Sequence, residues 1–534
     1  MAILTDLLAS PYLVDGIIVA LGVVFLSNYF GDFADGFPYK NIPSVGWDSW
    51  TLTNKKAKDR FVSSARELIA QGFDQVRPSP TFEPGTSKPG KTAFQLMFSF
   101  RPVIVLHPRY LEEVKSHPHL DFHKAIRKSF FGGRYPGFEV FQGDTDNIVT
   151  DLVNKKLTHA LGQITIPLSR EVGDTLRDTY SDSKEWSTHT FAQEVPNMVA
   201  RVSSLVFQGT EICQNKKWLD VSVNYAIDSF IAARELRQWP GVLRPIVHWF
   251  LPAAQRTREH MKVGRQIIGR EIARRGLVQG EIPKKVEGRQ PDAIDWSHEI
   301  AAGRPFDATL LQVGLGLAAI HTTSNLLTNV MYDLTAHQEY IQPLRDEIKA
   351  VVEEEGILRK TGLTKLKLMD SVIKETQRMN PISMTSIHRY ANKEIPLSDG
   401  TIIPKNASIV ISSHNMGNEE IYPGANTYDG YRFFNKRQEP GNAHRFQLVT
   451  TSPEHTGFGH GLHACPGRFF AANEVKILLI HLLMKYEWKF ADREGRPKNF
   501  DHGTEIICDP TVKFLFRRRE PEIDLALLGE GDLA

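Results

Sequence analysis

The stretch of sequence that decides the fold reads Phe458-Gly459-His460-Gly461-Leu462-His463-Ala464-Cys465-Pro466-Gly467. Its glycines let the backbone pass close to a flat ligand, where a side chain would collide. Proline is favoured at the first position of a helix, so we expect the Cys465 sulfur at a helix N-terminus. Free N–H groups and the helix dipole stabilise a thiolate there, and a thiolate binds iron tightly. The stretch therefore predicts Cys465 as an iron ligand, with Phe458 shielding its sulfur.

A lone cysteine beside a glycine-rich turn is more often an inert core residue. The frame Phe-x-x-Gly-x-x-x-Cys-x-Gly argues against that, because roughly one chain in a thousand of this composition would contain it by chance. The other two cysteines, Cys213 and Cys508, have no such frame. Without a C-x-x-C pair, three cysteines form neither a disulfide framework nor a zinc ribbon, which indicates a reducing compartment.

Composition sets the class of protein. The chain has 534 residues, of which 41% are hydrophobic and 24% charged, so it can bury a sizeable core. Its formal net charge is only +2, without a concentrated Lys/Arg stripe, and we expect no nucleic-acid partner. We find no Gly-x-Ser-x-Gly elbow, so a serine hydrolase is not indicated.

The N-terminus predicts a membrane anchor. After a short segment of residues 1–11, residues 12–30 are apolar over about the length that crosses a bilayer as a helix. A signal peptide would need a basic start, yet the first thirty residues contain no Lys or Arg. Basic residues begin only afterwards, which favours a cytosolic position for the rest of the chain. Residues 31–46 contain Pro38 and Pro43 and predict a stiff hinge between membrane and domain.

The remaining pattern predicts one domain over residues 47–520, followed by a C-terminal tail over 521–534. Apolar runs on either side of Arg101-Pro102 are typical of a small hairpin. From about residue 110 to 382 the period is helical, with a long helix from about Phe306 to Ala336. Short strands and turns follow, then a helix from Pro466 to about Lys485 and a strand at 512–516. We therefore expect a mainly α fold with a minor β portion.

The cysteine stretch resembles the heme-binding signature of the cytochromes P-450, Phe-x-x-Gly-x-Arg-x-Cys-x-Gly. The resemblance implies a heme b cofactor (iron protoporphyrin IX) with Cys465 as the axial iron ligand, in a single-domain cytochrome P-450 fold. It also implies that Phe458, Gly461 and Gly467 surround the cofactor. His463 stands where the family has arginine, a position that contacts a heme propionate.

A second motif of the family is a Glu-x-x-Arg helix. Glu375 and Arg378 lie three residues apart, share a helix face and match this motif by their place about ninety residues before the cysteine. Glu271 and Arg274 have the same spacing, and we expect them to form only a solvated ion pair.

Two further arginines match the family. Arg432, in Tyr-Asp-Gly-Tyr-Arg-Phe, matches the arginine that completes a buried charge network with the Glu-x-x-Arg helix, which is a structural role. Arg389, just after His388, resembles a strand arginine that binds a propionate.

The long helix contains Ala318-Ala319-Ile320-His321-Thr322-Thr323, where the family has (Ala/Gly)-Gly-x-(Asp/Glu)-Thr-Thr. Thr322 matches the oxygen-activating threonine, whose hydroxyl can relay protons. A threonine within a helix more often bonds the carbonyl of the preceding turn. His321 replaces the acid, and an imidazole can still pass protons.

The sequences of these motifs are similar to those of fungal members that oxidise terpenoids and related secondary metabolites. The resemblance implies a monooxygenase on the endoplasmic reticulum membrane, single-pass with a cytosolic catalytic domain. Its electrons would come from NADPH through NADPH-cytochrome P-450 reductase, with cytochrome b5 as a further partner. Membrane lipid and an apolar small molecule would be its other partners, and loops around 130–138 and 207–237 would contact the substrate. The alternative is a heme-thiolate isomerase or dehydratase, which needs no reductase.

Overall fold

A computed structural model describes residues 36–47, 54–76, 93–144, 146–278, 281 and 288–529, together with the single positions 15, 16, 19 and 22. The predicted segment 1–11 lies outside the described residues, and so does almost all of the predicted anchor at 12–30. One described helix, Ala308–Ala336, is long and apolar enough to cross a membrane. Half of its most apolar window is buried inside the protein, as in a core helix.

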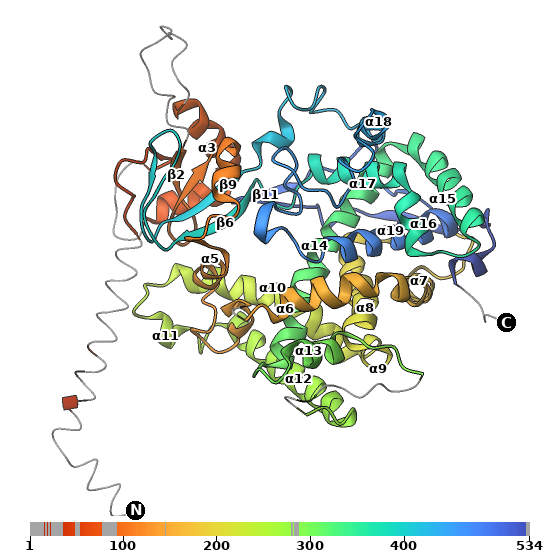
Figure 1. Ribbon diagram of the computed structural model, residues 1–534, viewed down its shortest axis with the longest axis horizontal. Helices are drawn as coiled ribbons and strands as arrows, with labels where there is room; N and C mark the ends of the chain where they lie inside the picture. Colours follow the sequence, from red (N-terminus) through yellow and green to blue (C-terminus); the bar gives the residue numbers. More distant parts are fainter. Residues whose placement is uncertain are drawn as a thin grey trace, which may run out of the picture.

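Long α-helices make up most of the described chain (Figure 1). The longer ones are α3 (Lys55–Val76), α7 (Thr158–Tyr180), α8 (Phe191–Gln208), α10 (Lys216–Gln238), α12 (Pro252–Arg274), α14 (Ala308–Ala336), α15 (Ile341–Glu355), α17 (Lys367–Met379) and α19 (Arg468–Lys485). The predicted long helix is confirmed as α14, which begins where the Asp307 carboxylate accepts from the Leu310 amide. The mainly α prediction is therefore confirmed.

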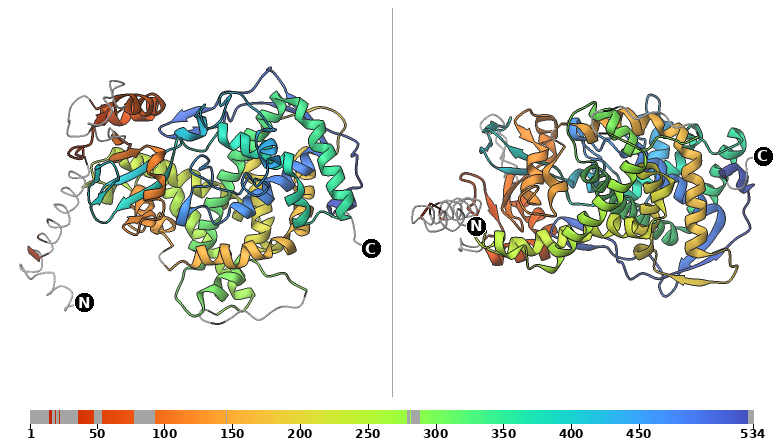
Figure 2. Two further views of the ribbon diagram at one scale, coloured as in Figure 1. Left: turned by 45° about the horizontal axis from the view of Figure 1, so that its top comes forward. Right: turned by 90° about the horizontal axis from the view of Figure 1, so that it is seen from below.

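A six-stranded sheet with α3 lies at one end of the molecule (Figures 1 and 2). Its strands, in spatial order, are β1 (Ser44–Val45), β2 (Ala93–Met97), β3 (Pro102–Leu106), β9 (Ser408–Ser412), β6 (Thr385–Ala391) and β4 (Leu120–Asp121). β2 and β3 pair antiparallel, which confirms the predicted hairpin. β3 pairs parallel with β9, so the chain beyond residue 382 returns to a sheet that was begun near residue 93.

Smaller sheets complete the β portion. They comprise β10 (Tyr486–Phe490) with β13 (Phe514–Arg518) and β5 (Ser187–His189), β11 (Phe500–His502) with β12 (Glu505–Ile507), and β7 (Ile395–Pro396) with β8 (Ile402–Ile403). The strand expected at 512–516 begins two residues later, as β13.

The end of the predicted hinge is part of the fold. Val45 lies in β1, which pairs parallel with β2, and both Ile42 and Val45 are buried. The Gln95 side chain accepts from the Tyr39 amide at 2.8 Å and donates to the Ile42 carbonyl at 2.8 Å. A spacer would not bury apolar side chains against a sheet, so the hinge prediction is wrong for residues 37–46.

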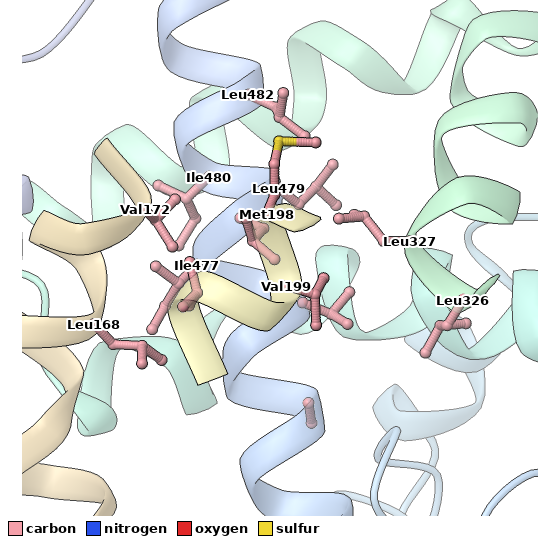
Figure 3. Packing of buried hydrophobic residues seen from close by; sticks show 14 of the residues in the cluster. Leu168, Val172, Met198, Val199, Leu326, Leu327, Ile477, Leu479, Ile480 and Leu482 are labelled. Atoms are coloured by element: carbon pink, nitrogen blue, oxygen red, sulfur yellow. The ribbon is translucent and has the colours of Figure 1, made fainter. Parts of the chain in front are cut away.

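The main core forms where four helices meet (Figure 3). α19 is buried along most of its length, because apolar residues occupy nearly every position between Val475 and Met484. α7, α8 and α14 surround it, and Leu168, Met198 and Leu327 point toward it from these helices. This packing holds the first turn of α19, and with it the cysteine stretch, in a fixed place.

Candidate active site

The cysteine stretch is a tight loop whose glycines have specific roles. Gly459 and Gly461 have φ values of +68° and +79°, a backbone conformation that favours glycine. A Cβ at Gly461 would also lie 2.7 Å from the Cβ of Lys115. The Cys465 amide donates to the Phe458 carbonyl at 2.8 Å, which closes the loop. Backbone conformation and the approach of Lys115 are therefore sufficient reasons for Gly461.

The sulfur of Cys465 lies at the beginning of α19. The helix begins at Arg468 rather than at Pro466, with Gly467 as the capping residue. Burial raises the pKa of the Cys465 thiol, while the Gly467 and Arg468 amides and the Arg468 charge act in the opposite direction. The Arg468 guanidinium also donates to the Cys465 carbonyl at 2.8 Å. The sulfur thus faces groups that stabilise an anion.

The other two cysteines are buried elsewhere. The Cys213 thiol donates to the Thr210 carbonyl, and Cys508 donates to the Asn325 side chain at 3.0 Å. Burial raises the pKa of each thiol to about 12. In the described part of the chain, no three His, Cys, Asp or Glu side chains are placed to hold a metal ion.

His463 lies against the start of α5 (Phe122–Ser129). Its ring stacks on Phe122 with centroids 5.4 Å apart and meets His123 edge-on at 5.9 Å. Burial, then the charge of Arg389, then His123 lower the pKa of His463 to about 4. The sequence did not indicate Phe122 or His123, because a contact across more than 300 residues leaves no local pattern.

Arg389 reaches the same place from β6. A β-bulge between Ser386 and Arg389 inserts one extra residue, and Ile387 there has a φ of +53°, unusual for a β-branched residue. The buried Arg389 side chain donates to the Lys115 carbonyl at 3.2 Å and lies over the Phe122 ring. Burial lowers its pKa to about 10, with Asp121 acting in the opposite direction. The structure therefore brings Arg389 and His463 together.

Glu375, Arg378 and Arg432 form a buried charge network. Arg378 donates two hydrogen bonds to the Glu375 carboxylate, each of 2.8 Å, and Arg432 donates a third at 3.0 Å. Glu375 is fully buried. The arginines also donate to the carbonyls of Met416 and Pro423, both at 2.7 Å. The network thus ties α17 to the irregular chain that precedes the cysteine stretch.

The same helix contacts the chain that leads into the cysteine stretch. A Cβ at Gly457 would lie 2.3 Å from the Gln377 amide oxygen, so a larger residue there would displace the Gln377 side chain. The Lys374 ammonium donates to the Gln447 and Thr450 carbonyls, both at 2.9 Å. α17 therefore supports the stretch from one side.

Glu271 is buried, contrary to the prediction, although its partner Arg274 is exposed. Glu271 is only 6% exposed and accepts from Arg274 and from the buried Arg275. Arg275 in turn donates two hydrogen bonds of 2.7 Å to Asp292, ahead of α13 (Ala293–Ala301). Arg275, the residue after the predicted partner Arg274, therefore connects Glu271 to Asp292 in a buried network.

Thr322 faces open space. Its hydroxyl donates to the Ala318 carbonyl at 2.8 Å, as in an ordinary helical threonine. Yet Thr322 and Ala318 are exposed, whereas Ile320 and Thr323 on the same helix are buried. Residues four apart share a helix face, so one face of a core helix is left uncovered there.

His321 points toward α10 instead. Its Nε2 lies 2.8 Å from the Val223 carbonyl, which can only accept, so Nε2 carries the proton. Burial lowers the pKa of His321. The neutral imidazole therefore connects α14 to α10 by a hydrogen bond. Its role in proton transfer stays a prediction.

These residues fit a heme. The sulfur faces anion-stabilising groups, Arg389 supplies a cation that suits a propionate, and an uncovered face of α14 carries small side chains. A mainly helical fold with one such cysteine defines a heme-thiolate protein as the class.

Comparison with known proteins agrees with this class. The family model for cytochrome P450 matches residues 88–516. Cytochrome P450 monooxygenase trt6 of Aspergillus terreus is 42% identical over 487 residues, 90% of this chain and 95% of that protein. Cytochrome P450 monooxygenase calE of Penicillium decumbens is 37% identical over 97% of this chain and 98% of that protein. Cytochrome P450 monooxygenase ptmU of Penicillium ochrochloron is 38% identical over 88% and 90%, respectively.

This chain belongs to the cytochrome P450 family. The resemblance drawn from the cysteine stretch is thereby confirmed, and so is the activity class, a heme-thiolate monooxygenase.

Proposed function

We propose that this monooxygenase inserts one oxygen atom from O2 into an apolar small molecule, a terpenoid or related fungal secondary metabolite. NADPH-cytochrome P-450 reductase supplies the electrons, and cytochrome b5 is a second donor. The carrying observation is the Cys465 sulfur at the start of α19, facing the Gly467 and Arg468 amides. The fungal origin of the similar monooxygenases supports the substrate class.

Each site residue then has a role. A bound heme supplies the iron on which oxygen is activated. Cys465 provides the thiolate, and Phe458 shields it. His463 and Arg389 hold the propionates. Thr322 moves a proton toward the reacting oxygen from its uncovered position on α14.

The proposed location is the endoplasmic reticulum membrane, with residues 12–30 as a single anchor and the domain in the cytosol. Exposed apolar side chains between α10 and α12 support lipid contact by the domain as well. Ile246, Trp249 and Phe250 are 60%, 50% and 73% exposed, and they gather around α11 (Arg244–Val247). Aromatic side chains of this kind are typical of membrane interfaces.

Reconstitution tests the function. The purified holoenzyme is combined with the reductase, NADPH and a panel of terpenoids, and products are identified by mass spectrometry under ¹⁸O2. We expect one labelled oxygen atom in the product and no product without NADPH. A rearranged or dehydrated product that forms without NADPH would favour the isomerase or dehydratase alternative.

A further inference from the structure

A cavity of about 800 Å³ lies between the β2–β3 hairpin, α5 and the end of α10. Figure 1 shows α5 between the sheet and α10. The volume is within the range of small-molecule sites. Its wall contains the rings of Phe100, Phe131 and Trp239. Among the described residues that line it, eight are lysine or arginine and only Asp121 is acidic.

Asp121 carries a single negative charge, which does not balance the four basic side chains Lys124, Arg127, Lys128 and Arg237. Its carboxylate caps α5 by accepting from the Lys124 amide at 2.8 Å. The basic side chains of α5 have neutral neighbours: the Lys124 ammonium donates to Asn392 at 2.7 Å, and both Lys124 and Lys128 lie over the Tyr390 ring. Within the described chain, neither lysine makes an ion pair.

Arg237 contributes a half-buried cation. Its guanidinium donates to the Ser129 carbonyl and lies over the rings of Phe100 and Phe130, at 5.1 and 5.3 Å. Its Nε has no hydrogen-bond partner among the described residues. Burial lowers the pKa of Arg237 to about 10. Glu505 acts in the opposite direction, but no carboxylate among the described residues accepts a hydrogen bond from this guanidinium. An anion in the cavity would therefore pair with a partly desolvated cation.

The cavity adjoins the cysteine stretch. His123 lines it, and the His123 ring contacts the ring of His463, two residues before Cys465. Gln142 also lines the cavity. Val140, two residues earlier, packs against α14, because a Cβ built on Gly314 would lie 3.5 Å from the Val140 side chain. One wall of the cavity is thus shared with the surroundings of the active site.

On the basis of the proposed monooxygenase function, we propose that the substrate is an apolar skeleton bearing a carboxylate, and that this cavity binds the carboxylate. Arg237 and the basic side chains of α5, Lys124, Arg127 and Lys128, attract the anion. The aromatic rings of the wall contact the adjoining skeleton. This assigns a charge-selective subsite to a site otherwise expected to accept only apolar compounds.

Matched pairs of ligands test the proposal on the holoenzyme. The probes are hexadecanoic acid with its methyl ester and abietic acid with its methyl ester, measured by equilibrium dialysis, which requires no turnover. We expect at least one acid to bind about tenfold more tightly than its ester, about 1.4 kcal/mol. Arg237→Gln and Arg127→Gln should each reduce that ratio severalfold and leave ester binding unchanged. Arg270→Gln, an exposed arginine of α12 outside the cavity, is the control.

Three results would overturn the proposal. The first is equal binding of the acid and its ester for both skeletons. The second is an unchanged ratio of acid to ester affinity in the double variant Arg127→Gln/Lys128→Gln, which replaces only exposed side chains. The third is a folded Arg237→Gln protein without heme, since the cations would then serve the cofactor.

An anionic lipid headgroup offers the same chemistry from another source. In nanodiscs, phosphatidylserine should compete with the bound acid no better than phosphatidylcholine does. Competition that depends on Arg237 would assign the cavity to lipid and overturn the substrate proposal. Acid binding as expected without any NADPH-dependent product would contradict the proposed oxidation instead, so the two failures are distinguishable.

Discussion

Cys465 is the residue on which the proposed chemistry depends. Replacing it by alanine should abolish the long-wavelength absorption band of the reduced carbon monoxide complex, because iron–thiolate ligation produces that band. Cys213 and Cys508 cannot substitute, since burial raises the pKa of both thiols to about 12. The control is Cys213→Ala, which should keep the band. A Cys465→Ala protein with an intact band would refute the assignment of the ligand.

In the proposed function, Thr322 determines how much of the reducing equivalents reaches product. Thr322→Ala should still bind heme and substrate, because the cysteine stretch is untouched. Loss of its hydroxyl should raise hydrogen peroxide and lower product per NADPH consumed, by severalfold, since proton delivery is impaired. Thr322→Ser keeps a hydroxyl and is the matched control. If Thr322→Ala and wild type gave equal yields of product per NADPH, the threonine would have only the helical role that its bond to Ala318 shows.

The sequence predicts site residues that belong to a local motif. It does not predict site residues that come from distant parts of the chain and meet only in the folded protein. Cys465 and Thr322 could be proposed from sequence because their neighbours in sequence are also their neighbours in space. Phe122 and His123 could not, because only the fold places α5 beside His463. Arg468 was within reach, since it directly follows the glycine that caps α19.

Among the elements, α17 links the charge network to the chain that leads into the cysteine stretch. Glu375→Ala and Arg378→Ala should each give little holoprotein, because either change strands a buried charge at about 3–5 kcal/mol. Asp174→Ala is the control, since Asp174 and Arg177 have the same spacing but are 45% and 51% exposed. Breaking that pair should cost about 0–1 kcal/mol. Heme content and thermal unfolding measure both effects, and equal losses in all three variants would contradict the role of α17.

Glu271→Ala separates stability from cofactor binding. The Glu271 network is buried but joins α12 to the chain before α13, far along the sequence from the cysteine stretch. We expect a lower unfolding temperature with a normal heme content in the protein that remains folded. A heme deficit equal to that of Glu375→Ala would show that any buried charge network has this effect.

Periodicity predicted the helices well and the strands less well. α14 and α19 have long apolar patterns, which predict a helix, and both are core helices in the structure. β6 was missed because its bulge at Ile387 breaks the two-residue alternation on which strand prediction rests. The burial of Glu271 could not be predicted, because Arg275 connects it to Asp292, which lies 17 residues further along the chain than Arg275.

At the scale of the whole molecule, two N-terminal deletions distinguish membrane attachment from the stability of the fold. Deleting residues 1–35 should release much of the protein from membranes and leave heme content unchanged, if residues 12–30 are the anchor. Deleting residues 1–46 should also destabilise the fold, because burial of Ile42 and Val45 is lost, at about 3–6 kcal/mol in total. Membrane fractionation and thermal unfolding of both proteins give the answer. Equal stability of the two would contradict the packing of residues 37–46 on the sheet.

The clamp that Gln95 makes on Tyr39 and Ile42 also limits how far the domain can move from a bilayer. If residues 12–30 cross it, only residues 31–36 remain as a tether, and six residues span at most about 20 Å. Gly36, at the end of that tether, lines the same cavity as Arg237 and Trp239. The mouth of the cavity would then lie at headgroup depth. An amphiphilic acid dissolved in the bilayer presents its carboxylate at that depth, so the enzyme would sample ligand at its two-dimensional density in the leaflet rather than at its scarce aqueous concentration.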